Sequence, residues 1–159
     1  MIRFAKRRVG VVLLVCAAAL AFLTAVAIGS KHRGVSYSTG DFLVDCNSSD
    51  GTPQVCDPPE KLRVRVGRSG VRIKRVRYVA SSKHCSAGRV LVSLDGKPIG
   101  RTDFVNAGEK ATVDGLKVTL GKGRHTFSFR IEGRTGGCNI GYVGSWGGKI
   151  TLKGSKRRR

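Results

Sequence analysis

One short stretch of the sequence concentrates side chains that bind anions. Residues 61–77 contain eight Lys and Arg and no acid, whereas residues 34–60 contain five acids and neither Lys nor Arg. Guanidinium and ammonium groups bind phosphate and other anionic groups, so this stretch is a candidate anion-binding surface. The alternative is a solvated face whose long side chains splay apart. The candidate anion-binding residues are Arg63, Arg65, Arg72, Lys74, Arg75 and Arg77.

A hairpin is expected to position these cations. Apolar and charged residues alternate on both sides of Arg68-Ser69, which predicts two strands joined by a two-residue turn. The predicted cross-strand pairs are Val66–Val71 and Val64–Ile73 on the inner face, and Arg65–Arg72 and Arg63–Lys74 on the outer face. A β-bulge is expected near Arg75, where the alternation slips. If the acidic segment 41–60 covered this ladder, the contact would be self-neutralising instead of a ligand site.

Four cysteines beyond the first 30 residues are candidates for disulfides. No CxxC motif occurs and the three His lack ligand-like spacing, so disulfides are favoured over a zinc site, and neither metal nor cofactor is predicted. Three pairings are possible. We prefer Cys46–Cys56 with Cys85–Cys138, because the first closes a short loop of Gly, Pro and Ser and leaves the distant pair to cross-link the core.

The sequence does not predict an enzyme. A sortase-like use of Cys138 is disfavoured because it lies in GGCNIG and no Arg follows it before Arg157. Cys85 is no better, since adjacent strand residues such as His84 and Cys85 point to opposite faces. The oxygen donors of DCNSSDG miss the EF-hand pattern for calcium. No nucleophile, base and orienting group can be placed together.

A glycine-rich segment near the end of the chain is a candidate sugar site. Seven Gly lie between Gly133 and Gly148, around Tyr142 and Trp146. Such a segment could form a rim on which a sugar stacks against one of these aromatic rings. The alternative is a bulged strand in which Trp146 is partly packed.

Composition limits the class of partner. The 159 residues carry a formal net charge of +20, which predicts an acidic partner or neighbourhood. With 40% apolar residues and 22 Gly, the chain is neither a disordered polyelectrolyte nor a polytopic membrane protein. Nucleic acid is not expected, because only 6% of the residues are aromatic and those on strands mostly share the inward phase.

The first 30 residues predict export. Residues 9–28 carry no charge and would form a helix of about 30 Å, enough to span a bilayer. The heavier basic flank precedes them, so residues 1–8 are predicted to be cytoplasmic and the remainder extracytoplasmic. We expect an uncleaved single-pass anchor, with cleavage at the A-x-A pattern of Ala25 and Ala27, giving a secreted protein, as the alternative. A linker at 29–40, a folded domain at 41–154 and a basic tail at 155–159 would follow.

The predicted domain is an all-β, antiparallel sandwich of about seven strands. Period-two alternation marks strands at 61–66, 89–94, 116–120, 126–131 and 149–153. Asp50-Gly51, Asp95-Gly96 and Asp114-Gly115 are expected to form turns where strands end. Repeated short strands separated by such turns are typical of a disulfide-bonded β-sandwich.

Two resemblances to known families agree with a sandwich. VLVSLDGKPIG (Val90–Gly100) and LGKGRHTFSFRIEG (Leu120–Gly133) resemble the strand-turn motifs of bacterial immunoglobulin-like or fibronectin-like modules. That resemblance implies a stalk or adhesive unit. GCNIGYVGSWGGKITL (Gly137–Leu152) is similar to the last strands of galactose-binding-like jelly rolls, which implies sugar binding along a loop rim or sheet face.

Together these features predict a non-catalytic, membrane-anchored, extracytoplasmic β-sandwich protein. Its expected partners are anionic cell-envelope polymers or lipid head groups, which it would bind or organise. The alternatives are a carbohydrate-binding or adhesive module, and a secreted inhibitor-like domain that recognises another protein after signal cleavage.

Overall fold

A computed structural model describes residues 34–47, 54–84, 86–134, 136 and 143–157. The predicted anchor at 9–28, Cys85, Cys138 and Tyr142 lie outside the described residues. Within the described ranges, no helix is long and apolar enough to cross a bilayer. His32–Arg159 forms one compact unit.

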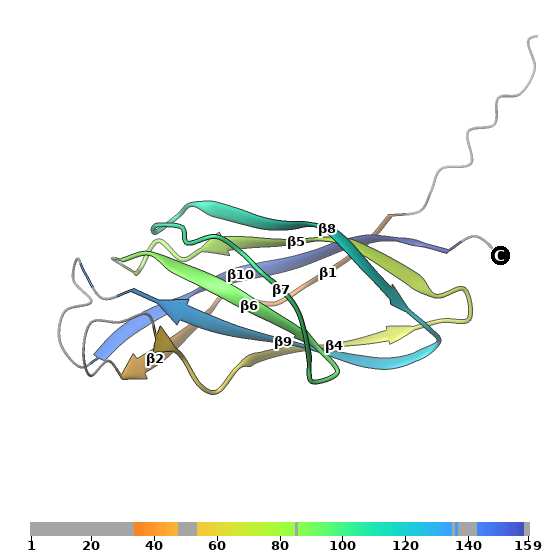
Figure 1. The fold of residues 1–159 in the computed structure, drawn as a ribbon, viewed down its shortest axis with the longest axis horizontal. Coiled ribbons are helices and arrows are strands. Elements are labelled where there is room, and N and C mark those ends of the chain that lie inside the picture. Colours follow the sequence, from red (N-terminus) through yellow and green to blue (C-terminus); the bar gives the residue numbers. More distant parts are fainter. Residues whose placement is uncertain (1–33, 48–53, 85, 135, 137–142, 158–159) are drawn as a thin grey trace, which may run out of the picture. The chain divides into compact units, whose positions relative to one another are not determined.

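The described chain is all-β, as predicted (Figure 1). Its ten strands are β1 Gly34–Ser38, β2 Phe42–Asn47, β3 Gln54–Val55, β4 Glu60–Val66, β5 Val71–Ala80, β6 Gly88–Leu94, β7 Lys97–Arg101, β8 Lys110–Leu120, β9 Gly123–Gly133 and β10 Val143–Lys156. Each of the five strands predicted from alternation lies within one of these elements. The count exceeds the seven expected, partly because two long edge strands are each interrupted by a few residues.

The strands form two antiparallel sheets. The first sheet has the order β1-β10-β5-β8, with β2 also paired to β10. The second has the order β3-β9-β6-β7, with β4 also paired to β9. β1 and β2 follow each other along β10, with Ser38 opposite Thr151 and Phe42 opposite Gly148. Each sheet is therefore effectively four strands wide.

Local hydrogen bonds bridge both interruptions. Between β1 and β2, the Thr39 N–H donates to Ile150 O, and the Ile150 N–H donates to Thr39 Oγ1, both at 3.0 Å. Between β3 and β4, the Cys56 N–H donates to Ile131 O at 2.8 Å, just before the cis Asp57-Pro58 bond. The first residue of each break is thus still hydrogen-bonded to the neighbouring strand although the edge strand is not continuous.

The strand order is that of a jelly roll. When β1/β2 and β3/β4 are each taken as one strand, successive strands alternate between the sheets, and only β6 and β7 form a hairpin within one sheet. Eight strands connected in this way make the double Greek key of a jelly roll. The immunoglobulin order, ABED against CFG, is different, so the first resemblance is wrong in topology.

The core is one apolar layer between the two sheets. Alternate residues of β5 and β10 meet alternate residues of β4, β6 and β9 there. Its largest fully buried side chains are Trp146, Tyr78, Phe127, Phe129, Ile73, Leu120, Ile131, Ile150 and Leu152. Each such side chain contributes about 1.5–3 kcal/mol on leaving water, which makes this layer the main stabilising element.

The Cys46–Cys56 disulfide is confirmed. Its Cα atoms are 5.0 Å apart, and both side chains are buried. Cys46 lies on β2 at the edge of the first sheet, and Cys56 directly follows β3 at the edge of the second. The bond therefore fastens the two sheets together along one edge. The Cys85–Cys138 pairing stays a prediction, although Ser86 and Gly136 lie close together.

Two predicted boundaries of the domain need correction. Residues 34–38, expected in the linker, form β1, whose Ser-rich outward positions hid the alternation of Val35 and Tyr37. The tail expected from 155 is ordered at its start, because Ser155 and Lys156 pair with β5 and the Arg157 N–H donates to Gly70 O at 3.3 Å.

The three predicted Asp-Gly turns have different outcomes. Asp95-Gly96 forms the β6–β7 turn, with positive φ at both residues, as predicted. Asp114-Gly115 does not end a strand. It lies within β8, where Gly115 has a φ of 71° opposite a register shift in β5. Figure 1 shows that β8 bends along its length. The Asp-Gly pair thus produces a bulge instead of a turn, and Asp50-Gly51 lies outside the described residues.

Trp146 explains two glycines of the second sheet. A Cβ at Gly133 would lie 2.2 Å from the Trp146 ring, and one at Gly88 would lie 3.1 Å from it. Gly88 and Gly133 face each other in the β6–β9 register. The Trp146 indole therefore crosses the core and packs against the backbone of Gly88 and Gly133 in the opposite sheet.

We expect Gly133→Ala to lower the free energy of unfolding by about 3 kcal/mol, because the methyl group must displace the Trp146 ring. Gly40→Ala is the matched control, since a Cβ there meets nothing within 4 Å. Urea unfolding followed by tryptophan fluorescence measures both. Equal stability of the two variants would contradict the packing described.

Candidate anion-binding site

The predicted cation ladder is divided between the two sheets. The tight turn at Arg68-Ser69 is present, with the Gly70 N–H bonded to Gly67 O at 3.1 Å. The strands that it joins do not pair with each other. β4 pairs with β9, which sets Arg65 opposite Arg124, whereas β5 pairs with β10 and β8. The predicted hairpin and its cross-strand pairs are therefore wrong.

Burial does not distinguish the two arrangements, because in either one the Val and Ile residues of both strands can face the core. Like charges also lie opposite each other in both: the hairpin would pair Arg65 with Arg72, and the observed registers set Arg65 opposite Arg124 and Arg75 opposite Lys153. The outcome depends on the strands that flank each one, which are β9 for β4, and β10 and β8 for β5. In the observed fold the cations of β4 and those of β5 lie on opposite sheets.

One set of cations forms the outer face of the first sheet. This first basic face contains exposed Lys and Arg from three adjacent strands, together with partly exposed Arg77. The exposed members are Arg72, Lys74 and Arg75 of β5, Lys149 and Lys153 of β10, and Lys110 and Lys117 of β8. Sequence reasoning missed the β8 and β10 members. The alternation indicated that these side chains point outward, but it did not indicate that β8 and β10 flank β5.

The predicted bulge in β5 is confirmed by the register shifts toward both of its neighbours. A hollow of about 670 Å³ lies at this bulge. Its lining residues are Arg72, Lys74, Arg75, Lys153, Asp114, Gly115 and Gly154. Lys74 has no directly opposite partner in either the β5–β10 or the β5–β8 register. A Cβ at Gly154 would lie 2.4 Å from Arg72 O, so glycine permits the close approach of β10 there.

Asp114 is the one acid among the residues that line this hollow, and its carboxylate already accepts two hydrogen bonds. Arg75 Nε donates to Asp114 Oδ1, and Thr112 Oγ1 donates to Asp114 Oδ2 at 2.9 Å. The bond from Arg75, followed by that from Thr112, lowers the pKa of Asp114. In the described part of the chain, Arg72, Lys74 and Lys153 have no ion-pair partner. Three uncompensated cations therefore point to one open site.

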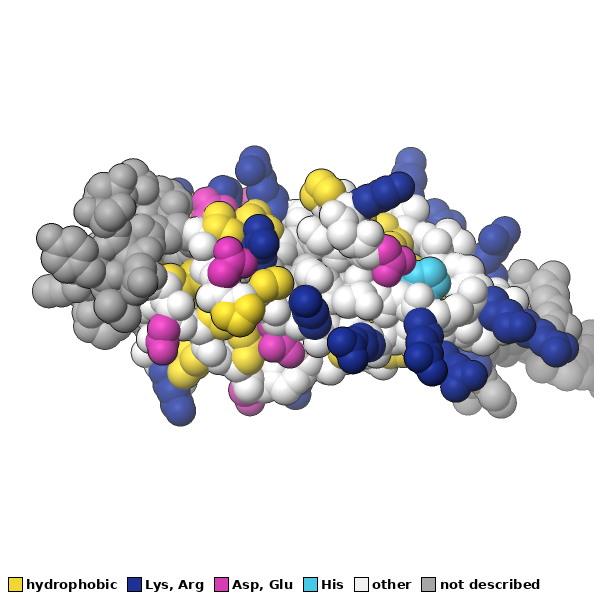
Figure 2. Space-filling view, turned by 90° about the horizontal axis from the view of Figure 1, so that it is seen from below, with side chains coloured by type: hydrophobic (Ala, Val, Ile, Leu, Met, Phe, Trp, Pro, Cys, Tyr) yellow, Lys and Arg dark blue, Asp and Glu magenta, His cyan; other side chains and the backbone are white. Residues whose placement is uncertain are grey.

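A second basic face lies on the outer side of the second sheet. It consists of exposed Lys61, Arg63 and Arg65 on β4 and Arg124 on β9. Figure 2 views the molecule from below and shows Lys and Arg side chains gathered toward one end. Nearer the other end, Arg130 is paired with Asp57 at 3.1 Å. The acidic segment therefore neutralises Arg130, while Arg63 and Arg65 stay exposed.

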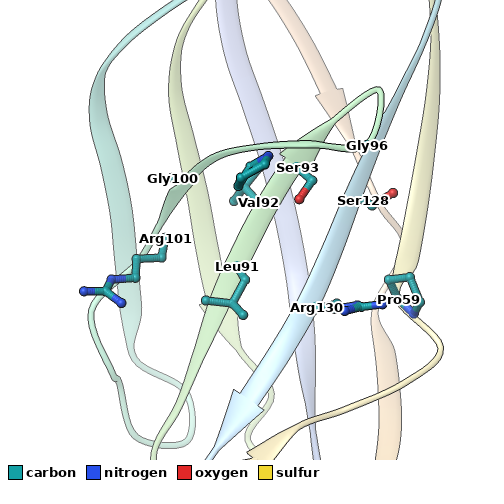
Figure 3. Close-up of a pocket in the computed structure, with 10 residues that line it drawn as sticks. Pro59, Leu91, Val92, Ser93, Gly96, Gly100, Arg101, Ser128 and Arg130 are labelled. Carbon is teal, nitrogen blue, oxygen red and sulfur yellow. The ribbon is translucent and has the colours of Figure 1, made fainter.

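The second sheet also carries a shallow depression of about 640 Å³ (Figure 3). In the register across the sheet, Leu91 lies between Arg101 of β7 and Arg130 of β9. The remaining lining residues are Pro59, Val92, Ser93, Gly96, Pro98, Gly100 and Ser128. None of these lining residues is aromatic, so the depression offers no ring for sugar stacking.

Trp146 does not fit the sugar-stacking prediction. Its side chain is 1% exposed, and its Nε1–H donates to Ser86 Oγ at 3.1 Å. A ring enclosed between the sheets cannot stack on a sugar, so this prediction is wrong for Trp146. Tyr142 lies outside the described residues.

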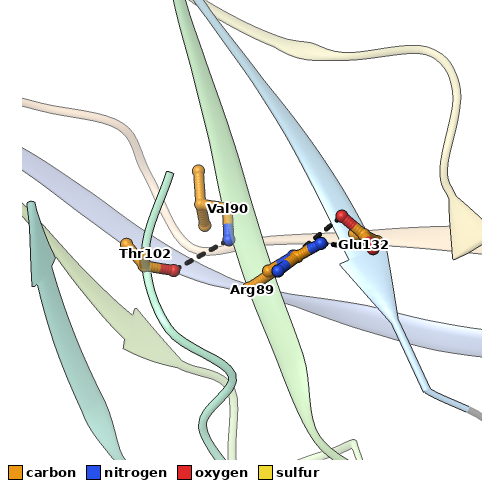
Figure 4. A network of polar contacts seen from close by, with 4 residues as sticks. All are labelled: Arg89, Val90, Thr102 and Glu132. Carbon is orange, nitrogen blue, oxygen red and sulfur yellow. Dashed lines mark hydrogen bonds and ion pairs between the residues drawn. The ribbon is translucent and has the colours of Figure 1, made fainter. Parts of the chain in front are cut away.

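A partly buried ion pair joins β6 to β9 (Figure 4). Arg89 donates to both carboxylate oxygens of Glu132, at 2.8 Å each. The guanidinium also lies 4.5 Å from the centroid of Phe104, and Arg134 lies 4.1 Å from the same ring. Beside it, Thr102 Oγ1 accepts the Val90 N–H at 3.0 Å. The charges of Arg89 and Glu132 therefore satisfy each other, and their pair links β6 to β9.

His125 is likewise held by its neighbours. Its Nδ1 lies 2.9 Å from Asp95 Oδ2, and its Nε2 lies 3.2 Å from Gly121 O. Both partners are acceptors, so only the imidazolium donates to both. The Asp95 bond, and then the Gly121 carbonyl, raise the pKa of His125. The Thr126 N–H, and then His125, lower the pKa of Asp95.

The comparisons with known proteins add no family. No family model matches the chain, and no curated protein matches it in sequence. Among solved structures, it is similar to infectious bursal disease virus, Gt strain, with 11% identity over 76% of this chain and a TM-score of 0.36. It is also similar to the Podospora anserina GH26-CBM35 β-(1,4)-mannanase, with 19% identity over 81% and a TM-score of 0.37. The chain spans 33% and 29% of these two proteins.

The Arg89–Glu132 pair should contribute more to the free energy of unfolding than the Arg75–Asp114 pair. Arg89 and Glu132 are 21% and 11% exposed, whereas Arg75 and Asp114 are 52% and 55% exposed. We expect Glu132→Gln to lower the free energy of unfolding by about 2 kcal/mol, because it weakens a desolvated bidentate pair. Asp114→Asn, the exposed control, should leave the urea midpoint nearly unchanged. Equal losses would contradict this assignment.

Stability should depend on pH through His125. Because folding raises its pKa, its contribution is complete below pH 6.5 and is lost as pH rises through the folded pKa. The Asp95 contribution is present above pH 3.8 and is lost as pH falls below it. The unfolding midpoint of wild type should therefore fall, relative to that of His125→Gln, as pH rises above 6.5. Parallel pH curves for the two proteins would contradict the arrangement.

Proposed function

We propose that this chain is a non-catalytic, membrane-anchored, extracytoplasmic β-sandwich protein that binds anionic polymers of the cell envelope. The anchor at 9–28 and the exported location rest on the sequence. The binding site that we propose is the hollow of the first basic face.

The observation that carries the proposal is the convergence of Arg72, Lys74 and Lys153 on one hollow beside the Arg75–Asp114 pair. A bulge in β5 and the close approach of β10 at Gly154 bring these side chains to one hollow. Unpaired guanidinium and ammonium groups in one site favour a ligand with several phosphate or carboxylate groups. Lys110, Lys117 and Lys149 extend the positive face on either side, which suits a polymer more than a single ion.

One observation favours a second candidate function. The depression of the second sheet sets Leu91 between Arg101 and Arg130, with the hydroxyls of Ser93 and Ser128 nearby (Figure 3). An apolar floor flanked by cations would suit an acidic sugar such as a uronate. Because Arg130 is already paired with Asp57, we rank this candidate second.

The test compares two triple variants of the full chain in neutral detergent, with fluorescent long-chain polyphosphate as the probe. Arg72→Gln/Lys74→Gln/Lys153→Gln removes the free cations of the hollow and keeps Arg75 paired. Lys110→Gln/Lys117→Gln/Lys149→Gln removes the same charge elsewhere on the same face. We expect the hollow variant to lose about 10- to 100-fold in affinity at 0.15 M salt and to show a shallower salt dependence, whereas the control loses about threefold or less.

The other outcomes discriminate between the candidates. Equal losses in both variants would contradict a defined site in the hollow. Preference for oligoglucuronate together with its loss in Arg101→Gln would favour the second candidate, and salt-independent binding would contradict both candidates, because each relies on cations. Neutral dextran, which carries no charge, should not bind.

A further inference from the structure

We propose that the domain is a two-sided binder: its first and second basic faces each take a separate anionic polymer, so that one chain bridges two. This inference rests on the proposed function and adds the second face and the number of partners. The ligand chemistry of both faces is that of phosphate-bearing or other polyanionic polymers.

The fold turns the two sets of cations in opposite directions. Arg72 and Lys74 project from the first sheet and Arg63 and Arg65 from the second, with the apolar core between the sheets. Packed sheets lie about 10 Å apart. With extended Lys and Arg chains on both outer sides, the charged groups of the two faces lie about 20 Å apart.

That separation makes the faces electrostatically independent. The screening length at physiological ionic strength is about 8 Å, less than half the distance between the faces. An anion bound on one side therefore neither neutralises nor blocks the other. A polymer segment lying along one sheet cannot reach the opposite face without passing around an edge of the sandwich.

The second face has the charge pattern of a site of its own. Arg65 lies directly opposite Arg124, and Arg63 lies opposite Thr126, so the β4–β9 register places no carboxylate directly opposite these two cations. The Asp95 carboxylate beside Thr126 is already paired with His125. In the described part of the chain, Lys61, Arg63, Arg65 and Arg124 have no ion-pair partner. Like charges left opposite each other are unfavourable in the free protein and are relieved when an anion binds between them. All four side chains are exposed, and Figure 2 shows Lys and Arg side chains gathered toward one end of the view from below.

The experiment measures binding and bridging separately. Two populations of beads, each coated with long-chain polyphosphate and labelled in a different colour, are mixed with the full chain in neutral detergent. Micelles are kept in large excess so that each holds one chain, which light scattering verifies. Binding is the protein retained on one bead population, and bridging is the fraction of beads in two-colour clusters.

We expect wild type to bind and to bridge, with bridging falling again at high protein concentration as every polymer site becomes occupied. The first-face variant Arg72→Gln/Lys74→Gln/Lys153→Gln and the second-face variant Lys61→Gln/Arg63→Gln/Arg65→Gln remove three charges each. Each should still bind through its intact face, the first-face variant with the 10- to 100-fold weaker affinity expected above because the second face is the weaker site, but each should lose about tenfold or more in bridging. The two variants mixed together should not restore it. Thermal unfolding verifies that both variants fold.

Several results would overturn the inference. Undiminished bridging by the second-face variant would show that its cations are not a site. Binding by wild type without bridging would show a single site or one polymer wrapped around both faces. A titration with the short probe hexaphosphate that found one molecule bound per chain, instead of two, would show a single site. Failure of wild type to bind polyphosphate at all would instead contradict the proposed function, so the two failures are distinguishable.

Discussion

The burial of one apolar layer between two sheets determines where every charge of this domain points. Residues such as Val66, Val71, Ile73 and Phe127 are almost completely buried, so each strand must place one set of alternate residues inward. Because the period of a strand is two, the Lys and Arg that alternate with them are forced outward. The basic faces therefore follow from the packing of the core.

The connections between strands then divide those charges. Consecutive strands of a jelly roll change sheets, and the turn at Arg68-Ser69 carries the chain from the second sheet to the first. The cations before this turn thus lie on one side of the sandwich and those after it on the other. At the edge opposite β7 and β8, the Cys46–Cys56 bond holds the sheets together. The core, the disulfide and Trp146 packed onto Gly133 make a rigid support on which two charged surfaces can act separately.

Alternation and turn chemistry were sufficient to predict the all-β class, the position of most strands, the bulge near Arg75 and the Cys46–Cys56 bond. They could not predict which strands pair. Val64 and Ile73 satisfy the core equally well in one sheet or in two, so the sequence around Arg68 does not distinguish a hairpin from an arch between sheets. Asp114-Gly115 failed for a similar reason, because a positive φ serves a bulge as well as a turn. Lys153 joined the site only through its place opposite Arg75, which depends on strand order.

The division of the cations between the sheets can be measured directly. Spin labels introduced as unnatural amino acids at positions 63 and 74 leave the native cysteines intact, and pulsed dipolar spectroscopy gives the distance between them. With the labels on opposite outer faces, we predict a distribution centred at about 20 Å or more, from the spacing of packed sheets. A distribution centred below about 10 Å, as for neighbours across a hairpin, would contradict the account.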